Sequence, residues 1–501
     1  MSITSYDPRT GAAGGAVEET SPADLAAAVH RAQGAAAAVA AAPPAERRGW
    51  LHAVADALEA HADELAALAD RETALGLPRL TGEVARAAAQ LRFYGDVAAE
   101  GSFLGVTIDE ATDTTPRLVR VNRPIGPVAV FGASNFPFAF SVLGNDTGAA
   151  LAAGCPVVAK AHPAHPELSA RQVAIARAAL DGAGAPGGAF DVVVGHQAGV
   201  DLVQAPEIAA VAFTGSQAGG LALWQLANQR DVVIPVFAEM GTVNPVVVTR
   251  DRVPDIAAIA EGFVGSFTLG HGQFCTKPGL LLAPSGSGAA EAVASALRSQ
   301  APAPVMLTEP IADSVRAGID ELTAAGAEVV AGVGGDGTGW TAPAAVLAAD
   351  VTALKPGSRL LEECFGAVVL VVEYATDDEL RHAIAALQGS LAATVVADDA
   401  QDPQAAWVLD ALSHKAGRVT VNDWPTGVAF TWAQQHGGPW PSTTAPAATS
   451  VGAHGLDRFV RPVTFQSAED SWLPAEARAD NPWRLPRRVD GRLRTAEGGL
   501  A

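Results

Sequence analysis

The sequence predicts an α/β protein with a parallel sheet, a second α/β region and an extended hairpin. At 501 residues the chain exceeds the size of one hydrophobic core, so two or three domains are expected. From residue 127 onward, short apolar runs alternate with helical stretches, which is the pattern of parallel strands joined by crossover helices. A second alternation of the same kind begins near residue 242.

Helical signals dominate the first hundred residues. Ser21, Pro22 and Asp24 match an N-cap, a proline in the first turn and an acidic third position, and an alanine-rich stretch follows up to residue 43. Apolar residues then recur at three- and four-residue steps between Leu51 and Leu68, which predicts one apolar helix face. Residues 105–125 alternate in polarity, so we expect an extended hairpin that leaves the first domain.

The remaining elements follow from apolar runs and turn residues. In the first α/β region the expected strands are 127–131, 156–159, 190–194 and 209–213, and the expected helices are 145–153, 166–182 and 217–230. In the second region we expect helix 254–266, strands 279–283 and 366–373, helix 377–387, a loop over 333–345 and irregular backbone over 434–446. Parallel sheets bind ligands at the carboxyl ends of their strands, so candidate residues are sought there.

Composition excludes several classes of function. The formal net charge of -21 disfavours nucleic acids and anionic membranes as partners. Three cysteines are too few for a disulfide framework and suit a reducing compartment. The N-terminus shows no secretory signal, and no apolar run reaches the ~18–20 residues that span a bilayer. A soluble, cytoplasmic protein is therefore expected.

Cys275 is the strongest candidate for chemistry, because it is a lone thiol among small residues and thiolates attack carbonyl carbon readily. A buried structural cysteine is the alternative, and it is the expected role of Cys155. His271 lies four residues before Cys275, so a Cys–His hydrolase pair is a further interpretation, although neighbours in sequence need not meet in space.

Two polar residues at strand ends could assist such a nucleophile. Asn135 follows the strand 127–131, where its amide could donate to an oxyanion, or it could be an ordinary turn residue. Glu239 follows an apolar run and could act as a base, since an apolar setting would raise its pKa toward the working range; a solvated carboxylate is the alternative.

A dinucleotide could bind next to these residues. Gly215 and Ser216 form a strand-to-helix turn whose N–H groups could bind phosphate, with Gly220 in the following helix. Lys160 ends another strand and could contact ribose hydroxyls. No metal site is predicted, since His162 and His165 lack a matching cluster of ligands.

These segments occur in a familiar order, and the chain resembles the aldehyde dehydrogenase superfamily over about residues 5–470. The matching motifs are FGASNFP at 131–137, FTGS at 213–216, EMG at 239–241, GQFC at 272–275, EECFG at 362–366, and VN at 421–422 with PTG at 425–427. The resemblance implies thioester chemistry at Cys275, with Asn135 as oxyanion donor and Glu239 as the base that activates water. It also implies that Glu363 and Phe365 join Lys160 in binding the cofactor.

The resemblance also implies the domain plan. We expect a Rossmann-type cofactor domain at 1–104 and 126–241, an α/β catalytic domain at 242–433, and an oligomerisation arm with a C-terminal tail at 105–125 and 434–501. A homo-oligomer, either a dimer or a tetramer, is the expected assembly.

Finer features resemble the 2,5-dioxovalerate (α-ketoglutarate semialdehyde) dehydrogenases, which lie near NADP-dependent bacterial fatty aldehyde dehydrogenases. These features are KAHPAHP at 160–166, HGGPWP at 436–441 and the tail at 481–491. Pro163 stands where many NAD-using relatives carry a ribose-binding glutamate, so NADP is the expected cofactor and NAD remains possible. Arg458 and Arg461 are candidate partners for a substrate carboxylate. The alternatives are a dehydrogenase of fatty or other aldehydes, a catalytically silent binding protein on this fold, and the hydrolase above.

Overall fold

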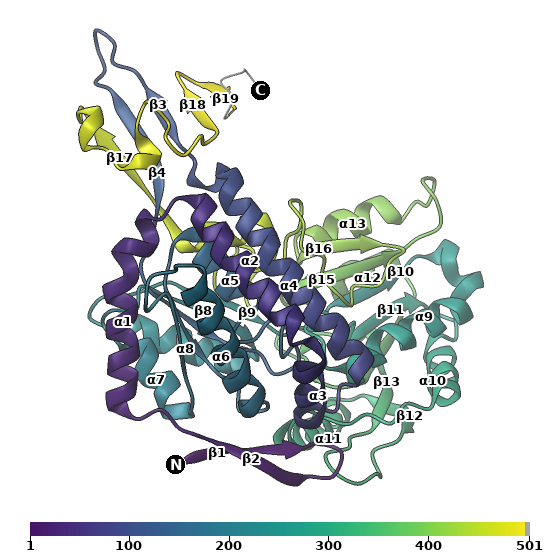
Figure 1. Cartoon of the computed structure of the whole chain (residues 1–501). Coiled ribbons are helices and arrows are strands. Elements are labelled where there is room, and N and C mark those ends of the chain that lie inside the picture. Colours follow the sequence, from purple (N-terminus) through teal and green to yellow (C-terminus); the bar gives the residue numbers. More distant parts are fainter. Residues whose placement is uncertain (496–501) are drawn as a thin grey trace.

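A computed structural model describes residues 1–495 of the chain. The first parallel sheet has the strand order β7-β6-β5-β8-β9 (Figure 1). Its strands are β5 (Val128–Phe131), β6 (Val157–Lys160), β7 (Phe190–Val193), β8 (Ala210–Gly215) and β9 (Val236–Met240). Crossover helices α5 (Asn145–Ala153), α6 (Pro166–Gly182), α7 (His196–Gln204) and α8 (Gln217–Asn228) connect them. The predicted alternation of strands and helices is thus confirmed in this region.

The second sheet has seven strands in the order β12-β13-β14-β11-β10-β15-β16. The strands are β10 (Pro245–Val248), β11 (Leu280–Pro284), β12 (Glu328–Val333), β13 (Ala344–Asp350), β14 (Val368–Tyr374), β15 (Ser390–Val396) and β16 (Ala416–Val421). Only β12, an edge strand, runs antiparallel to its neighbour. The helices here are α9 (Ile256–Thr268), α10 (Ala289–Gln300), α11 (Glu309–Ala324), α12 (Asp377–Ala386) and α13 (Ala405–Ser413).

A third sheet forms an arm that stands away from the body of the molecule (Figure 1). Its strands are β3 (Thr107–Asp109), β4 (Leu118–Pro124), β17 (Val460–Gln466), β18 (Arg487–Val489) and β19 (Arg492–Arg494). Strands β3 and β4 pair antiparallel, which confirms the hairpin predicted at 105–125. The C-terminal segment returns to this sheet, because β18 pairs with β3 of the same chain. Residues 496–501 of the predicted arm and tail lie outside the described residues.

The N-terminal hundred residues differ from prediction in two places. A hairpin of β1 (Ser2–Asp7) and β2 (Ala12–Glu18) precedes the first helix and was not foreseen. The stretch 51–68 is not one helix face, because the chain turns at His61 between α2 (Pro44–Ala60) and α3 (Ala62–Thr73). Helix α1 (Pro22–Ala41) begins as predicted, with Ser21 as N-cap accepting from the Asp24 N–H.

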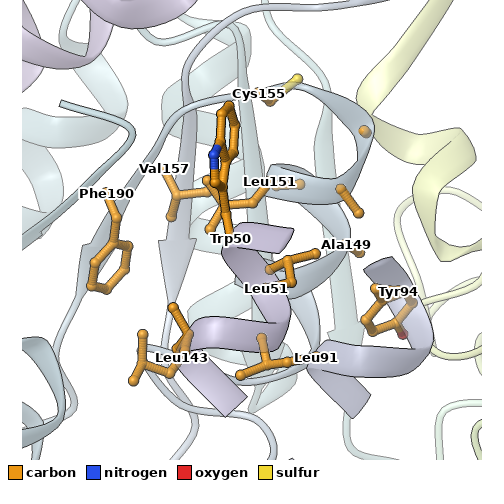
Figure 2. Close-up of a cluster of buried hydrophobic side chains, with 14 of the residues drawn as sticks. Trp50, Leu51, Leu91, Tyr94, Leu143, Ala149, Leu151, Cys155, Val157 and Phe190 are labelled. Atoms are coloured by element: carbon orange, nitrogen blue, oxygen red, sulfur yellow. The ribbon is translucent and has the colours of Figure 1, made fainter. Parts of the chain in front are cut away.

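The largest apolar core joins these helices to the first sheet. Trp50 and Leu51 of α2 and Leu91 of α4 (Leu77–Glu100) pack with α5 and β6 (Figure 2). Cys155 is fully buried in this cluster. No helix within residues 1–495 has the length and apolar character needed to cross a bilayer.

Candidate active site

Cys275 lies in the loop before β11, and its residue is only partly buried. The backbone reaches it through Gly272, which has a φ of +74°, in the left-handed region. A Cβ at this glycine would lie 2.2 Å from the Ala367 nitrogen, so no larger residue fits. The turn therefore needs glycine to deliver the thiol to its position.

Asn135 lies beside the loop that carries Cys275. Its side-chain Nδ2 donates to the Gln273 carbonyl at 2.8 Å, two residues before the cysteine. Arg79 holds the Asn135 backbone by donating to its carbonyl at 2.7 Å, and the guanidinium lies over the rings of Phe136 and Phe274. Because an amide nitrogen carries two N–H groups, one remains for an oxyanion formed at Cys275.

His436 is the site residue that sequence reasoning did not identify. Its Nε2 lies 3.8 Å from the Cys275 sulfur and 2.8 Å from Glu239 Oε1. The candidate partner His271 does not take this place, since its Nδ1 accepts from the Val305 N–H at 3.2 Å. The only signal for His436 was its position in the HGGPWP segment, and no spacing rule connects that segment to Cys275.

Backbone pairing along the edge of the first sheet places His436. The Met240 N–H donates to the Ser442 carbonyl at 2.9 Å, and the Ala238 N–H donates to Thr444 Oγ1 at 2.9 Å. The region 434–446 is irregular, as predicted, but it lies along strand β9 as an extra edge. This pairing brings the histidine next to the carboxylate that ends β9.

Glu239 is buried, but the prediction that burial raises its pKa overall is wrong. Burial alone would raise the pKa of the Glu239 carboxyl, yet His436 and a hydrogen bond from Ser450 Oγ together lower it below its ordinary value. Glu239 is therefore an anion at neutral pH. As an anion, 2.8 Å from His436 Nε2 and in contact with the Cys275 thiol, the carboxylate is able to accept a proton.

The Cys275 thiol has the opposite shift. Burial raises its pKa well above the ordinary value, and the nearby charges of Glu239 and Glu363 raise it further. A thiol in this setting is protonated at neutral pH and needs an adjacent base to become a nucleophile. Two groups lie within reach of the thiol: the Glu239 carboxylate, which interacts directly with it, and Nε2 of His436 at 3.8 Å.

Further polar residues contact Ser450, the residue that donates a hydrogen bond to Glu239. Arg458 forms an ion pair with Asp146 at 2.8 Å and donates to the Ser450 carbonyl at 3.2 Å. The Arg458 side chain is therefore already occupied, which removes it as a candidate for binding a substrate carboxylate. Arg461 is exposed on arm strand β17, so the structure does not support that expectation either.

The ends of β6 and β8 suit a dinucleotide. The Lys160 ammonium, at the end of β6, has no hydrogen bond or ion pair within the described residues, and burial lowers its pKa. Ser216 caps helix α8 by accepting from the Gly219 N–H at 3.2 Å, directly after Gly215. Gly220 packs against β9, where a Cβ would lie 2.6 Å from Met240 Sδ. The turn thus presents a helix N-terminus to a phosphate group.

Glu363, in the segment before β14 of the second sheet, is a further candidate for contact with the dinucleotide. Its carboxylate lies against Gly241, where an added Cβ would be 2.1 Å from Oε2. Oε1 is buried and accepts no hydrogen bond within residues 1–495. Burial raises the pKa of this carboxyl to about 7, although the charge of Lys277 lowers it. An unpaired buried acceptor fits a ribose hydroxyl, so the residues present fit a nicotinamide dinucleotide; Phe365 is half-buried in the same loop.

A thiol beside buried polar groups, next to residues that fit a dinucleotide, is an arrangement that suits an oxidoreductase. Residues 1–464 match the aldehyde dehydrogenase family, and the chain belongs to that family. It is an NAD(P)-dependent aldehyde dehydrogenase. The alternative interpretation as a catalytically silent binding protein is therefore excluded.

Two of the curated relatives are semialdehyde dehydrogenases. The chain is 43% identical over 465 residues to alpha-ketoglutaric semialdehyde dehydrogenase 2 of Azospirillum brasilense, covering 90% of this chain and 88% of the relative. It is 40% identical over 464 residues to alpha-ketoglutaric semialdehyde dehydrogenase of Acinetobacter baylyi, covering 89% and 87%. The resemblance to this group of semialdehyde dehydrogenases is confirmed.

Solved structures confirm the fold. An NADP-dependent enzyme of E. coli matches with a TM-score of 0.80 at 24% identity, covering 93% of this chain and 94% of the other. PnpE in complex with nicotinamide adenine dinucleotide matches with the same score, identity and coverage.

Proposed function

We propose that this enzyme oxidises 2,5-dioxopentanoate to 2-oxoglutarate. The support is the level of identity to two alpha-ketoglutaric semialdehyde dehydrogenases over nine tenths of the chain. The purified protein should reduce the dinucleotide with this substrate at a higher kcat/KM than with neutral aliphatic or aromatic aldehydes. A preference for long-chain neutral aldehydes would instead make it a fatty aldehyde dehydrogenase.

The first chemical step is attack of the Cys275 sulfur on the aldehyde carbon. The Glu239 carboxylate, which interacts directly with the thiol, removes the thiol proton, and His436 positions this carboxylate through its Nε2, 2.8 Å from Oε1. The oxygen of the thiohemiacetal accepts a hydrogen bond from the free N–H of Asn135. When bound, the dinucleotide supplies the hydride acceptor for oxidation to the thioester, and we propose that Lys160, Gly215, Ser216, Gly220, Glu363 and Phe365 form its site.

The second step is release of the acyl group. Water must lose a proton as it attacks the thioester. Glu239, once it has released the thiol proton to solvent, accepts the water proton because its carboxylate lies within 4.8 Å of the Cys275 sulfur. Asn135 again donates to the oxyanion, and the departing thiolate takes back a proton from Glu239. The single observation that carries this mechanism is the interaction of the Cys275 thiol with the Glu239 carboxylate, which lies 2.8 Å from His436 Nε2.

The same interaction of thiol and carboxylate favours a second activity, hydrolysis of activated esters without a dinucleotide. The acyl group would pass from the ester to Cys275, the alcohol would leave with the thiol proton taken up by Glu239, and water would complete the cycle. Release of 4-nitrophenol from 4-nitrophenyl acetate in dinucleotide-free enzyme tests this activity. Loss of that release in Cys275→Ala would assign it to this site.

NADP is the proposed cofactor, with NAD accepted less well. Pro163, three residues after Lys160, places no carboxylate where it would repel a 2′-phosphate. Parallel measurements of kcat/KM for NADP and NAD test this preference, and Pro163→Glu should shift it toward NAD. An unchanged ratio in this variant would show that selectivity lies elsewhere.

The arm supports the proposal of a homodimer or a pair of dimers in the cytoplasm. It extends from the body (Figure 1), and large apolar side chains are exposed near helix α8: Trp224, Val232, Val233 and Trp440. Light scattering coupled to gel filtration measures the mass directly. The domain boundaries given above, 1–104 with 126–241, 242–433, and 105–125 with 434–501, are part of the same proposal.

A further inference from the structure

Two arginines near Cys275 have no carboxylate partner. Arg86 lies on helix α4 and Arg418 on strand β16, far apart in sequence. Neither guanidinium has an Asp or Glu oxygen within 4.0 Å among residues 1–495, whereas most other half-buried arginines of the chain do. The Nε of each is buried and donates to no acceptor in the same described range. A buried donor without an acceptor is costly, so this arrangement favours a ligand that is itself an acceptor.

One loop connects both arginines to the segment that carries Cys275. Arg86 Nη2 donates to the Val428 carbonyl at 2.5 Å, and Arg418 Nη2 donates to the Pro425 carbonyl. Between these two carbonyls, the Gly427 N–H donates to Thr276 Oγ1 at 3.2 Å. Thr276 directly follows Cys275, so the loop that carries both contacts is hydrogen-bonded to the residue next to the reactive sulfur.

The positive charges of Arg86 and Arg418 interact electrostatically with the Cys275 thiol. Burial lowers the pKa of both guanidinium groups, and interaction with Cys275 opposes that effect for each of them. Glu83 is the other charged group that acts on Arg86, but its carboxylate is occupied by the backbone N–H groups of Phe138 and Ala139. The two guanidinium groups thus interact with the Cys275 thiol in opposition to the carboxylates of Glu239 and Glu363, and Asp423 also acts on Arg418.

We propose that Arg86 and Arg418 together bind the carboxylate of the substrate and give this enzyme its preference for aldehydes with a negative charge a short carbon chain from the carbonyl. This inference deepens the proposed function and rests on it. An arginine fork matches a carboxylate in geometry and charge, and partial burial strengthens the contact. Arg86 and Arg418 take the role that the sequence had suggested for Arg458 and Arg461.

The test compares a charged aldehyde with a neutral one of the same length. Arg86→Gln and Arg418→Gln are assayed with 2,5-dioxopentanoate and with pentanal, beside the control Arg298→Gln. Arg298 is an exposed arginine that pairs with Glu291 on helix α10. Each site variant should lose about 100-fold in kcat/KM for the charged aldehyde, chiefly through KM, because a charge-assisted contact is lost. With pentanal both site variants should stay within about threefold of wild type, and the control should be unchanged with both substrates.

Activity with pentanal also shows that the variants fold. Equal losses with both aldehydes, or no loss with either, would overturn the assignment. If a glutamine variant is unstable, the lysine variant at the same position replaces it. Lysine keeps the charge but not the fork, so a smaller loss confined to the charged aldehyde is expected.

A binding measurement separates this inference from the choice of substrate. Cys275→Ala should bind 2-oxoglutarate in calorimetry, and adding Arg418→Gln should weaken the binding at least tenfold; equal binding would overturn the inference. If wild type prefers succinic semialdehyde and the arginine variants lose that activity selectively, the carboxylate site is confirmed and the proposed substrate is wrong. If wild type prefers pentanal over every anionic aldehyde, the carboxylate site and the proposed substrate are both wrong.

Discussion

Cys155 and Cys275 lie in different regions, and the pKa of each thiol is raised. Burial raises the pKa of Cys155 to about 11, and burial is also the largest cause of the raised pKa of Cys275. Their neighbours differ. The Cys155 sulfur contacts the Phe459 carbonyl at 3.2 Å inside an apolar core, whereas the Cys275 sulfur faces an imidazole that is paired with a carboxylate. A buried thiol thus gains chemistry from the base beside it, not from its own acidity.

The sharpest test of this contrast is removal of the nucleophile. Cys275→Ala should reduce turnover by more than about 1000-fold, since no other group can form the thioester. Dinucleotide binding, measured by fluorescence titration, should be retained because the proposed cofactor residues lie on other segments. Normal turnover in this variant would refute the assignment of the nucleophile.

Removal of the proposed base should have the next largest effect. Glu239→Gln should lower kcat by about 100- to 1000-fold, the usual contribution of a positioned general base. His436→Gln, which removes the partner that positions the carboxylate, should have a smaller effect. His271→Gln is the matched control, because its ring contacts a backbone N–H instead of the carboxylate, and it should stay within about threefold of wild type. Similar losses in Glu239→Gln and His271→Gln would contradict the role of Glu239.

The raised pKa of Cys275 predicts how its reactivity depends on pH. An acid whose pKa is raised stays protonated to higher pH, so the thiolate fraction in dinucleotide-free enzyme should grow about tenfold per pH unit between pH 7 and 8.5. The rate of alkylation by iodoacetamide, followed by mass spectrometry of the peptide that contains Cys275, measures this fraction. A rate independent of pH would mean that the thiol has already transferred its proton to Glu239.

Added zinc should distinguish the two thiol sites further. The ligand atoms of Glu239, Cys275 and His436 all lie within 4.8 Å of one another, and thiolate, imidazole and carboxylate are the donors that Zn²⁺ prefers. Micromolar Zn²⁺ should inhibit competitively with the aldehyde, while Mg²⁺ should not. In dinucleotide-free enzyme, zinc should protect Cys275 from alkylation, and His436→Gln should weaken this protection about tenfold.

The smallest effect on activity is expected at the other cysteine. Cys155→Ala leaves a small cavity in the core of Figure 2, at a cost of about 1–2 kcal/mol of stability. Turnover should remain within about twofold of wild type, while the melting temperature should fall by a few degrees. A large loss of activity without a loss of stability would show that the two cysteines are functionally connected.

Local sequence patterns determined much of this protein. Alternating apolar runs and helical stretches predicted the first parallel sheet and its helices, because chain periodicity and burial are local consequences of side-chain type. Motifs around Asn135, Glu239 and Cys275 identified residues that the fold brings to one place. The second sheet was predicted only in part, since β12 and β13 flank a loop rich in glycine and carry no distinctive signal of their own.

Only the tertiary structure decided how the site is charged. His436 reaches Cys275 because an irregular segment pairs with the edge of β9, and that pairing depends on backbone hydrogen bonds that no side-chain pattern specifies. The pKa of Glu239 moves opposite to expectation because its neighbours outweigh its burial. Electrostatics depends on distances across the fold, and in this protein those distances join residues far apart in the chain.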